Sequence, residues 1–192
     1  MKTLSLPNSY TVDLSMHFNN KGITNHDRTI QGKLDHSGLS LAGELLPNDE
    51  IKVVGGVAFR FARTDTHVDD HICCEQQRVE LPCENASSIS LLGFSLYGDY
   101  NSPMHIQYED GVTEKCNLGL SDWFCLSLPG NKLRFGEEPG IFMDYHYYGD
   151  NKIQSERGIW LQHIALNNTK KVQHIELPDN PYMFVFAITV NP

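Results

Sequence analysis

The sequence predicts an all-β fold, a single β-sandwich with jelly-roll-like connections, because three of its features are typical of that class. Apolar and polar residues alternate over several short stretches, which is the period of a strand with one buried face. Other short stretches are apolar throughout, and clusters of Gly, Pro, Asn and Asp separate the stretches at short intervals. Helical periodicity is nearly absent: only residues 39–47 could form a turn or two, which Pro47 would end.

The alternating stretches predict individual strands and one hairpin. Residues 57–62 place three large apolar side chains on one face, and residues 104–108 do the same. Asp110-Gly111 is a strong signal for a tight hairpin turn, and the alternation resumes over residues 116–120. We therefore expect an antiparallel pair at this place in the chain.

The continuously apolar stretches predict strands that are buried on both faces. Residues 88–98 and 182–190 have this pattern, which fits strands lying between two layers. Residues 158–166 and 172–177 are expected to form another pair, separated by a short polar loop. No linker, repeat or low-complexity segment interrupts the chain, so residues 1–192 are expected to form one domain.

Charge and composition exclude several classes of function. The chain of 192 residues carries a formal net charge of −9 and no basic run, which argues against nucleic acid or an anionic membrane as a partner. No apolar stretch is long enough for a signal peptide or a membrane span. Five cysteines, an odd number, fit reduced thiols better than a disulfide framework. We therefore expect a cytoplasmic protein.

Ligand-binding residues are expected in the longest stretches without a strand pattern, residues 15–50 and 121–157, because loops on a rigid sandwich carry function. The second stretch is unusually rich in aromatic residues. Aromatic rings stack on flat or sugar-like ligands, while His and Asp supply hydrogen bonds. The alternative is that these rings pack against the sandwich. The candidate ligand-binding residues are Asp122, Trp123, Tyr145, His146, Tyr147 and Tyr148.

A second cluster could hold a metal ion. His67, Asp69 and His71 alternate with a period of two, which would place all three on one face of a strand. The alternative is a polar turn followed by a buried strand that begins at Cys73 or Cys74.

The polar loop at Asn19, Asn20 and Asp35 is expected to add hydrogen bonds to the ligand. No cofactor is expected to be required, although oxygen ligands of the same loop could hold a structural Ca²⁺.

Catalytic machinery is not evident from sequence spacing. No carboxylate pair is selected by the sequence, and the nearest match to a nucleophile elbow has Ala42 where glycine is needed. If the protein is an enzyme, His146 or His71 is the candidate acid–base group, acting in an aromatic-lined pocket. The reaction would then belong to a cyclase, isomerase or hydrolase of a biosynthetic pathway.

The chain resembles a β-sandwich module found as an accessory domain of bacterial glycoside hydrolases, similar to galactose-binding-like and carbohydrate-binding jelly rolls. The resemblance implies that the protein binds a sugar or a glycosylated small molecule. It covers most of the chain, but it rests on phrases that encode mainly strands and turns, and His67 and His71 are not part of its pattern. The phrases are VDLSMHFNNKGIT (12–24), LDHSGLSLAGELLP (34–47), VVGGVAFRF (53–61), CCEQQRVELP (73–82), SLLGFSLYGD (90–99), IQYEDGVTEKCNLGLSDW (106–123) and IELPDNPYMFVFAITV (175–190).

Three functional hypotheses follow. The first is a carbohydrate-binding protein that uses the aromatic residues as its surface, and the second is the small enzyme described above. The third is an assembly protein in which the aromatic loop contacts another protein, for example in a homodimer.

Overall fold

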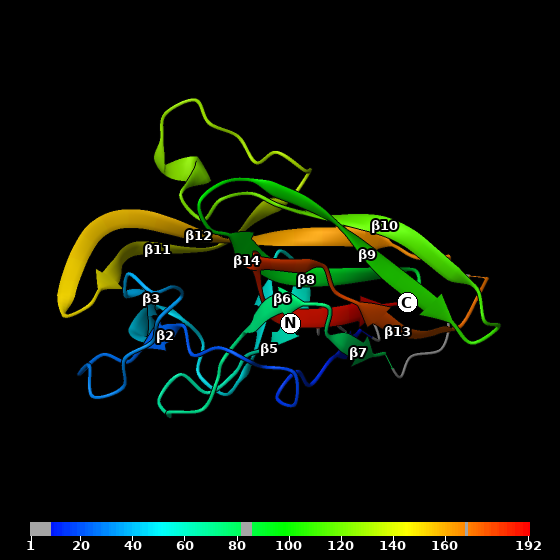
Figure 1. The fold of residues 1–192 in the computed structure, drawn as a ribbon, viewed down its shortest axis with the longest axis horizontal. Coiled ribbons are helices and arrows are strands. Elements are labelled where there is room, and N and C mark those ends of the chain that lie inside the picture. Colours follow the sequence, from blue (N-terminus) through cyan, green and yellow to red (C-terminus); the bar gives the residue numbers. More distant parts are fainter. Residues whose placement is uncertain (1–8, 82–85, 168) are drawn as a thin grey trace, which may run out of the picture.

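The computed structural model describes residues 9–81, 86–167 and 169–192. These residues form strands joined by loops, with two short 3₁₀ turns at Gly43–Leu45 (η1) and Cys125–Ser127 (η2) (Figure 1). The architecture is all-β, which confirms the predicted fold class. None of the helices in the described part of the chain is long and apolar enough to cross a membrane.

The larger sheet has eight strands and runs the length of the molecule (Figure 1). Its order is β1-β14-β8-β12-β11-β3-β2, and β6 also pairs with β14. The pairing is antiparallel except between β2 and β3. The strands are β1 (Tyr10–Thr11), β14 (Asp179–Asn191), β8 (Ser88–Ser95), β12 (Asn151–Ala165), β11 (Glu138–Tyr148), β3 (Leu39–Ala42), β2 (Ile23–Thr24) and β6 (Ile72–Glu75).

The smaller sheet has four strands, in the order β10-β9-β13-β7. Its hairpin turns at Asp110-Gly111, where Gly111 has a φ of 85°, so the predicted hairpin is confirmed. Its strands are β10 (Thr113–Leu120), β9 (Tyr100–Tyr108), β13 (Val172–Glu176) and β7 (Arg78–Glu80); a separate two-stranded hairpin consists of β4 (Ile51–Val54) and β5 (Val57–Arg60).

Two apolar clusters cover the two faces of the larger sheet. In one, Leu91 and Val185 of the larger sheet pack with Ile106 of the smaller sheet. In the other, Leu92 and Phe94 pack with the β4–β5 hairpin and the N-terminal loops. Strands β8 and β14 are therefore buried on both faces, as their continuous apolar sequences predict.

A β-bulge in β14 changes which side chains of this strand face the second cluster. The register with β8 shifts between Val185 and Ala187, so Phe186 is the extra residue. Phe184, Phe186 and Ala187 all belong to the second cluster, although strict alternation would divide them between the two faces. The bulge therefore adds Ala187, directly after Phe186, to the cluster that the two phenylalanines share.

Three expectations about local structure are corrected. Residues 158–166 and 172–177 do not pair with each other: β12 pairs with β8 and β11, while β13 pairs with β7 and β9. Residues 121–157 are not mainly loop, because they contain β11 and the start of β12. Residues 39–47 form strand β3 and the 3₁₀ turn η1. Sequence patterns identify strands, whereas pairing depends on contacts between distant segments.

Candidate ligand-binding groove

The aromatic residues that the sequence singled out lie mostly in the interior. Trp123 and Tyr147 are each 4% exposed, and His146 is 3% exposed. Tyr145 is half-buried, and Tyr148 is 46% exposed. Residues 145–148 end strand β11 at the turn of its hairpin with β12, so strand pairing fixes which rings point inward. Of these five residues, only Tyr148 presents an exposed ring.

Trp123 closes one end of the second apolar cluster. Its ring stacks on Phe94, with centroids 5.5 Å apart, and His146 meets it edge-on at 5.1 Å. Phe94 in turn contacts Phe184, with centroids 5.3 Å apart. Trp123 is therefore part of a continuous aromatic core rather than an open stacking platform.

Tyr145 and Tyr147 are tied to one carboxylate. Both hydroxyls donate hydrogen bonds of 2.6 Å to Oε1 of Glu44, in η1. Burial, followed by the hydrogen bond to Glu44, raises the pKa of Tyr147 to about 12. The ammonium group of Lys152 lies 3.3 Å from the centre of the Tyr145 ring, so that face is already occupied.

His146 is held in its neutral form. Burial is the main cause that lowers its pKa, to about 4, and the charge of Arg157 adds to the effect. Its Nδ1 has no hydrogen-bond partner among the described residues. His146 lines none of the cavities described below.

His71 is a core residue in a buried polar network. Its Nδ1 lies 2.9 Å from Oδ1 of Asp70, and its ring stacks on Phe186 with centroids 5.0 Å apart. Asp70 also accepts a hydrogen bond of 2.6 Å from Nζ of Lys21 and one of 2.9 Å from the backbone N–H of Gly22. The network anchors the N-terminal loop beside β6.

The three candidate metal ligands do not share a face. His67 is exposed, Asp69 is half-buried and His71 is fully buried. Among the described residues, no group of three or more His, Cys, Asp and Glu side chains is arranged to hold a metal ion. The segment instead forms a polar turn that leads into strand β6, in which Cys74 is buried, as the alternative interpretation of the sequence predicts.

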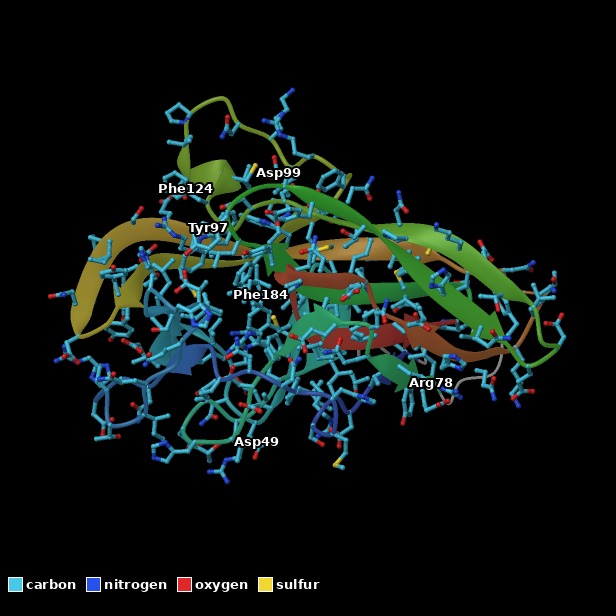
Figure 2. The ribbon with its side chains drawn as sticks, in the orientation of Figure 1. Asp49, Arg78, Tyr97, Asp99, Phe124 and Phe184 are labelled. Carbon is cyan, nitrogen blue, oxygen red and sulfur yellow. The ribbon has the colours of Figure 1, made fainter. Side chains whose placement is uncertain are left out.

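An open groove of about 550 Å³ lies between the N-terminal loops, β6 and the start of β14. This volume is typical of small-molecule sites. Leu34, Leu96 and Phe184 form its apolar floor, and Figure 2 shows Phe184 near the centre of the molecule. The polar groups that line it include both charge signs; they are Asn20, Lys33, Asp35, His36 and Glu75.

Three tyrosines from separate strands and turns meet at the rim of this groove. Tyr182 lines the groove and is 46% exposed. The ring of Tyr100 stacks on it at 16°, with centroids 6.0 Å apart. Tyr97, which is 61% exposed and labelled in Figure 2, meets Tyr182 edge-on at the same distance. We call Tyr97, Tyr100 and Tyr182 the tyrosine rim.

A family model described as an AziU2-like beta-sandwich domain matches residues 8–192. The chain belongs to this family. The comparison with curated proteins gave no match. The family match supports the β-sandwich, whereas the resemblance to sugar-binding accessory domains stays a prediction.

In this AziU2-like domain, Asp122 supports the rim instead of facing a ligand directly. Its Oδ2 accepts a hydrogen bond of 2.8 Å from the N–H of Gly98, and Ser95 Oγ donates one of 2.6 Å to the Gly98 carbonyl. These bonds hold the turn in which Tyr97 has a φ of 67°. That conformation is costly for a bulky residue and persists only where the surroundings enforce it, often at functional sites.

Asp35 holds the other side of the rim. The hydroxyl of Tyr97 donates to its Oδ2, and its Oδ1 accepts hydrogen bonds from the backbone of Ser37 and Gly38. Burial opposes ionisation of Asp35, but the hydrogen bonds from Tyr97 and Ser37 outweigh it and lower the pKa. Asp35 is therefore a fixed negative charge in the groove of the AziU2-like domain.

The loop residues considered for Ca²⁺ divide between two roles. Asn19 pairs with the backbone of Cys73 through both ends of its amide, at 2.7 and 3.0 Å. Asn20 and Asp35 line the groove. Sequence reasoning thus placed part of the groove, but it missed Tyr97 and Tyr182. In the sequence of this AziU2-like domain, both tyrosines stand beside turn-forming residues, in LYGD and in PDNPY. That position next to a turn was the signal that could have identified them.

Proposed function

We propose that this protein binds a sugar-sized polyhydroxylated ligand, free or as part of a glycosylated small molecule, in the groove beneath the tyrosine rim. The observation that carries the proposal is the exposure of Tyr182 and Tyr97 beside a groove with both acidic and basic side chains. Exposed aromatic rings in contact with one another at a concave surface are typical of ligand sites.

The chemistry of the groove suits such a ligand. A sugar ring has an apolar C–H face, which can lie on Tyr182, and hydroxyl groups that both donate and accept hydrogen bonds. Asp35 and Glu75 supply acceptors, and Lys33 supplies donors. The ordered hydrogen bonds around Asp35 and Gly98 keep the rim in place before binding, which reduces the entropy cost of association.

The enzymatic alternative has less support. His146 and His71 are both buried, and neither lines the groove. An acid–base group must lie within hydrogen-bond reach of the reacting atom, directly or through one water molecule. In the groove, Asp35, His36 or Glu75 would have to take that role.

Isothermal titration calorimetry against a panel of mono- and disaccharides and glycosides tests the proposal, with and without Ca²⁺. We expect saturable binding of at least one member and loss of that binding in Tyr182→Ala. The matched control is Tyr10→Ala, because Tyr10 is 43% exposed but pairs with the far end of β14. No heat across the panel, or binding that survives Tyr182→Ala unchanged, would refute the proposal.

A further inference from the structure

Arg157, in β12, is a cation that packs on two aromatic rings. It is half-buried, and its guanidinium carbon lies 4.8 Å from the centre of the Trp123 ring and 4.5 Å from that of the Phe124 ring. One nitrogen of the guanidinium group donates hydrogen bonds to the Ser155 hydroxyl and to the Glu156 carbonyl. Its Nε is buried and has no hydrogen-bond partner among the described residues. The two rings are therefore a main part of what stabilises this cation.

The segment that Arg157 covers, residues 122–124, is joined by backbone hydrogen bonds to two strands of the larger sheet. The N–H of Trp123 donates a bond of 2.9 Å to the carbonyl of Ser95, at the end of β8. The carbonyl of Trp123 accepts a bond of 2.9 Å from the N–H of Gly158, next to Arg157 in β12. The segment therefore connects β12 with the end of β8, where the turn of the tyrosine rim begins.

The tyrosine rim depends on this segment through Asp122. The two oxygens of its carboxylate accept hydrogen bonds of 2.8 Å, one from the N–H of Gly98 and one from the N–H of Phe124. Tyr97 lies in the same turn with a φ of 67°, a conformation that persists only while its surroundings enforce it. A displacement of residues 122–124 would therefore change the position of the exposed Tyr97 ring.

The charge of Arg157 also acts on Asp122. Burial raises the pKa of Asp122, with a smaller contribution from the charge of Asp99. The hydrogen bonds from Phe124 and Gly98 oppose this rise, and the charge of Arg157 opposes it further. The ionised carboxylate is the stronger acceptor for the N–H of Gly98. Arg157 therefore favours the state of Asp122 that holds the rim.

We propose that Arg157 is a positioning residue for the groove: it holds residues 122–124 in place, and these residues hold the turn that carries Tyr97. The inference rests on the proposed function, because the tyrosine rim serves binding only if the groove takes a ligand. Arg157 acts through the contact of its planar guanidinium group with two rings and through its charge near Asp122. The planar contact requires arginine, whereas lysine also carries the charge.

Two substitutions separate these contributions. Arg157→Met keeps an apolar stem but removes the planar group and the charge, while Arg157→Lys keeps the charge alone. In Arg157→Met we expect the pKa of Asp122, measured by NMR of its carboxyl carbon, to rise. We expect amide hydrogen exchange at Gly98 to become about threefold to tenfold faster, the range that a partly desolvated cation–π contact provides. In Arg157→Lys the pKa of Asp122 should stay close to that of the wild type, and exchange at Gly98 should be intermediate.

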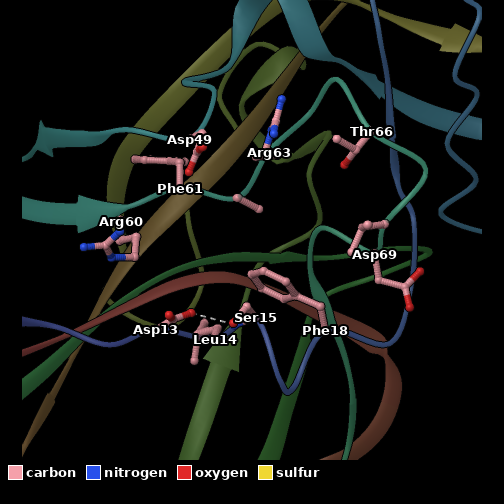
Figure 3. Close-up of a pocket in the computed structure, with 12 residues that line it drawn as sticks. Asp13, Leu14, Ser15, Phe18, Asp49, Arg60, Phe61, Arg63, Thr66 and Asp69 are labelled. Carbon is pink, nitrogen blue, oxygen red and sulfur yellow. Dashed lines mark hydrogen bonds between the residues drawn. The ribbon is translucent and has the colours of Figure 1, made fainter.

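Arg60→Met is the matched control. Arg60 is exposed and lines a separate cavity of about 370 Å³, between the segment after β1 and the loop after β5 (Figure 3). Its replacement should change neither exchange at Gly98 nor the pKa of Asp122. The amide of Leu92, in the second apolar cluster, reports any general loosening of the core. We expect its exchange to change less than that of Gly98 in both Arg157 variants.

Calorimetry with the sugar of the panel that binds most tightly completes the test. We expect Arg157→Met to bind it about threefold to tenfold more weakly than the wild type does. Unchanged exchange at Gly98, equal acceleration at Gly98 and Leu92, an unchanged pKa of Asp122 in Arg157→Met, or unchanged sugar affinity would each overturn the inference. If Arg157→Met does not fold, the comparison of Gly98 with Leu92 in Arg157→Lys decides.

Failure of the proposed function gives a different result from failure of this inference. If no sugar binds to the wild type, the proposed function is refuted, while hydrogen exchange at Gly98 and the pKa of Asp122 still show whether Arg157 holds the rim. If a sugar binds and these two quantities do not respond to Arg157→Met, the groove is the site and Arg157 does not position it.

Discussion

The hydroxyl of Tyr97 donates a hydrogen bond to the carboxylate of Asp35, which joins the turn after β8 to the loop before β3. This bond raises the pKa of Tyr97 and contributes to the lowered pKa of Asp35. It also fixes an exposed ring beside a charged group of the groove. The tyrosine rim and the polar side chains that line the groove are therefore linked directly, through Tyr97 and Asp35.

Removing the Tyr97 hydroxyl should change the ionisation of Asp35. In Tyr97→Phe the ionised carboxylate loses a donor, so we expect the pKa of Asp35 to rise. Titration of the Asp35 carboxyl carbon by NMR measures the change. Tyr100→Phe is the control, because Tyr100 contacts Tyr182 but not Asp35. An unchanged Asp35 titration in Tyr97→Phe would show that the bond does not persist in solution.

The two equally exposed tyrosines, Tyr182 and Tyr148, distinguish the groove from the hairpin surface that the sequence suggested. Each is 46% exposed, so replacement by alanine should cost either one little stability. We expect Tyr182→Ala to weaken ligand binding about tenfold or more, which corresponds to about 1.4 kcal/mol. Tyr148→Ala should leave the affinity unchanged.

Calorimetry with the panel member that binds most tightly gives the comparison. If binding is lost only in Tyr148→Ala, the binding site lies on the β11–β12 hairpin and not in the groove.

Asp122 should act on the groove through the backbone of the rim. In Asp122→Ala, the N–H of Gly98 and the N–H of Phe124 lose their acceptors. We expect faster amide hydrogen exchange at Gly98 and a loss of about 1–3 kcal/mol of unfolding free energy, because two partly buried donors lose a charged acceptor. Asp122→Asn keeps an acceptor oxygen and should recover part of both effects. Exchange at Gly98 that stays slow in Asp122→Ala would argue against this positioning role.

His146 should make the protein less stable in mild acid. The folded protein binds a proton at His146 only near pH 4, whereas the unfolded chain binds it near pH 6.5. Between these values the unfolded state holds more protons, so the unfolding free energy decreases as the pH falls, by at most about 1.4 kcal/mol per pH unit from this residue.

Urea unfolding at several pH values, compared between the wild type and His146→Leu, measures this contribution. The variant should show a shallower decline over this range, and His67→Leu, at an exposed site, should decline as the wild type does. Identical declines in the wild type and His146→Leu would rule out a protonation penalty at His146.

The positions of the strands could be predicted from the sequence, but the pairing of the strands with one another could not. Alternation located β5, β9 and β10, and continuous apolar runs located β8 and β14. The partners of β12 and β13 depend on segments far away in the chain, for which local sequence contains no signal.

The absence of a local signal for contacts between distant segments also explains why the sequence pointed to tyrosines that lie outside the groove. Tyr147 and Tyr182 both lie in strands with aromatic neighbours, yet one is buried and the other exposed. Glu44, which binds the Tyr147 hydroxyl, is 103 positions away in the sequence. Residue type predicted that exposed tyrosines would mark the site, and tertiary packing decided which tyrosines are exposed.

The most direct test of the central claim is chemical-shift mapping of ¹⁵N-labelled protein during titration with the sugars of the panel. If the groove is the binding site, the shifts should concentrate at residues 33–36, Tyr97 and Tyr182. Shifts confined to residues 145–148, or no shifts with any sugar, would contradict it.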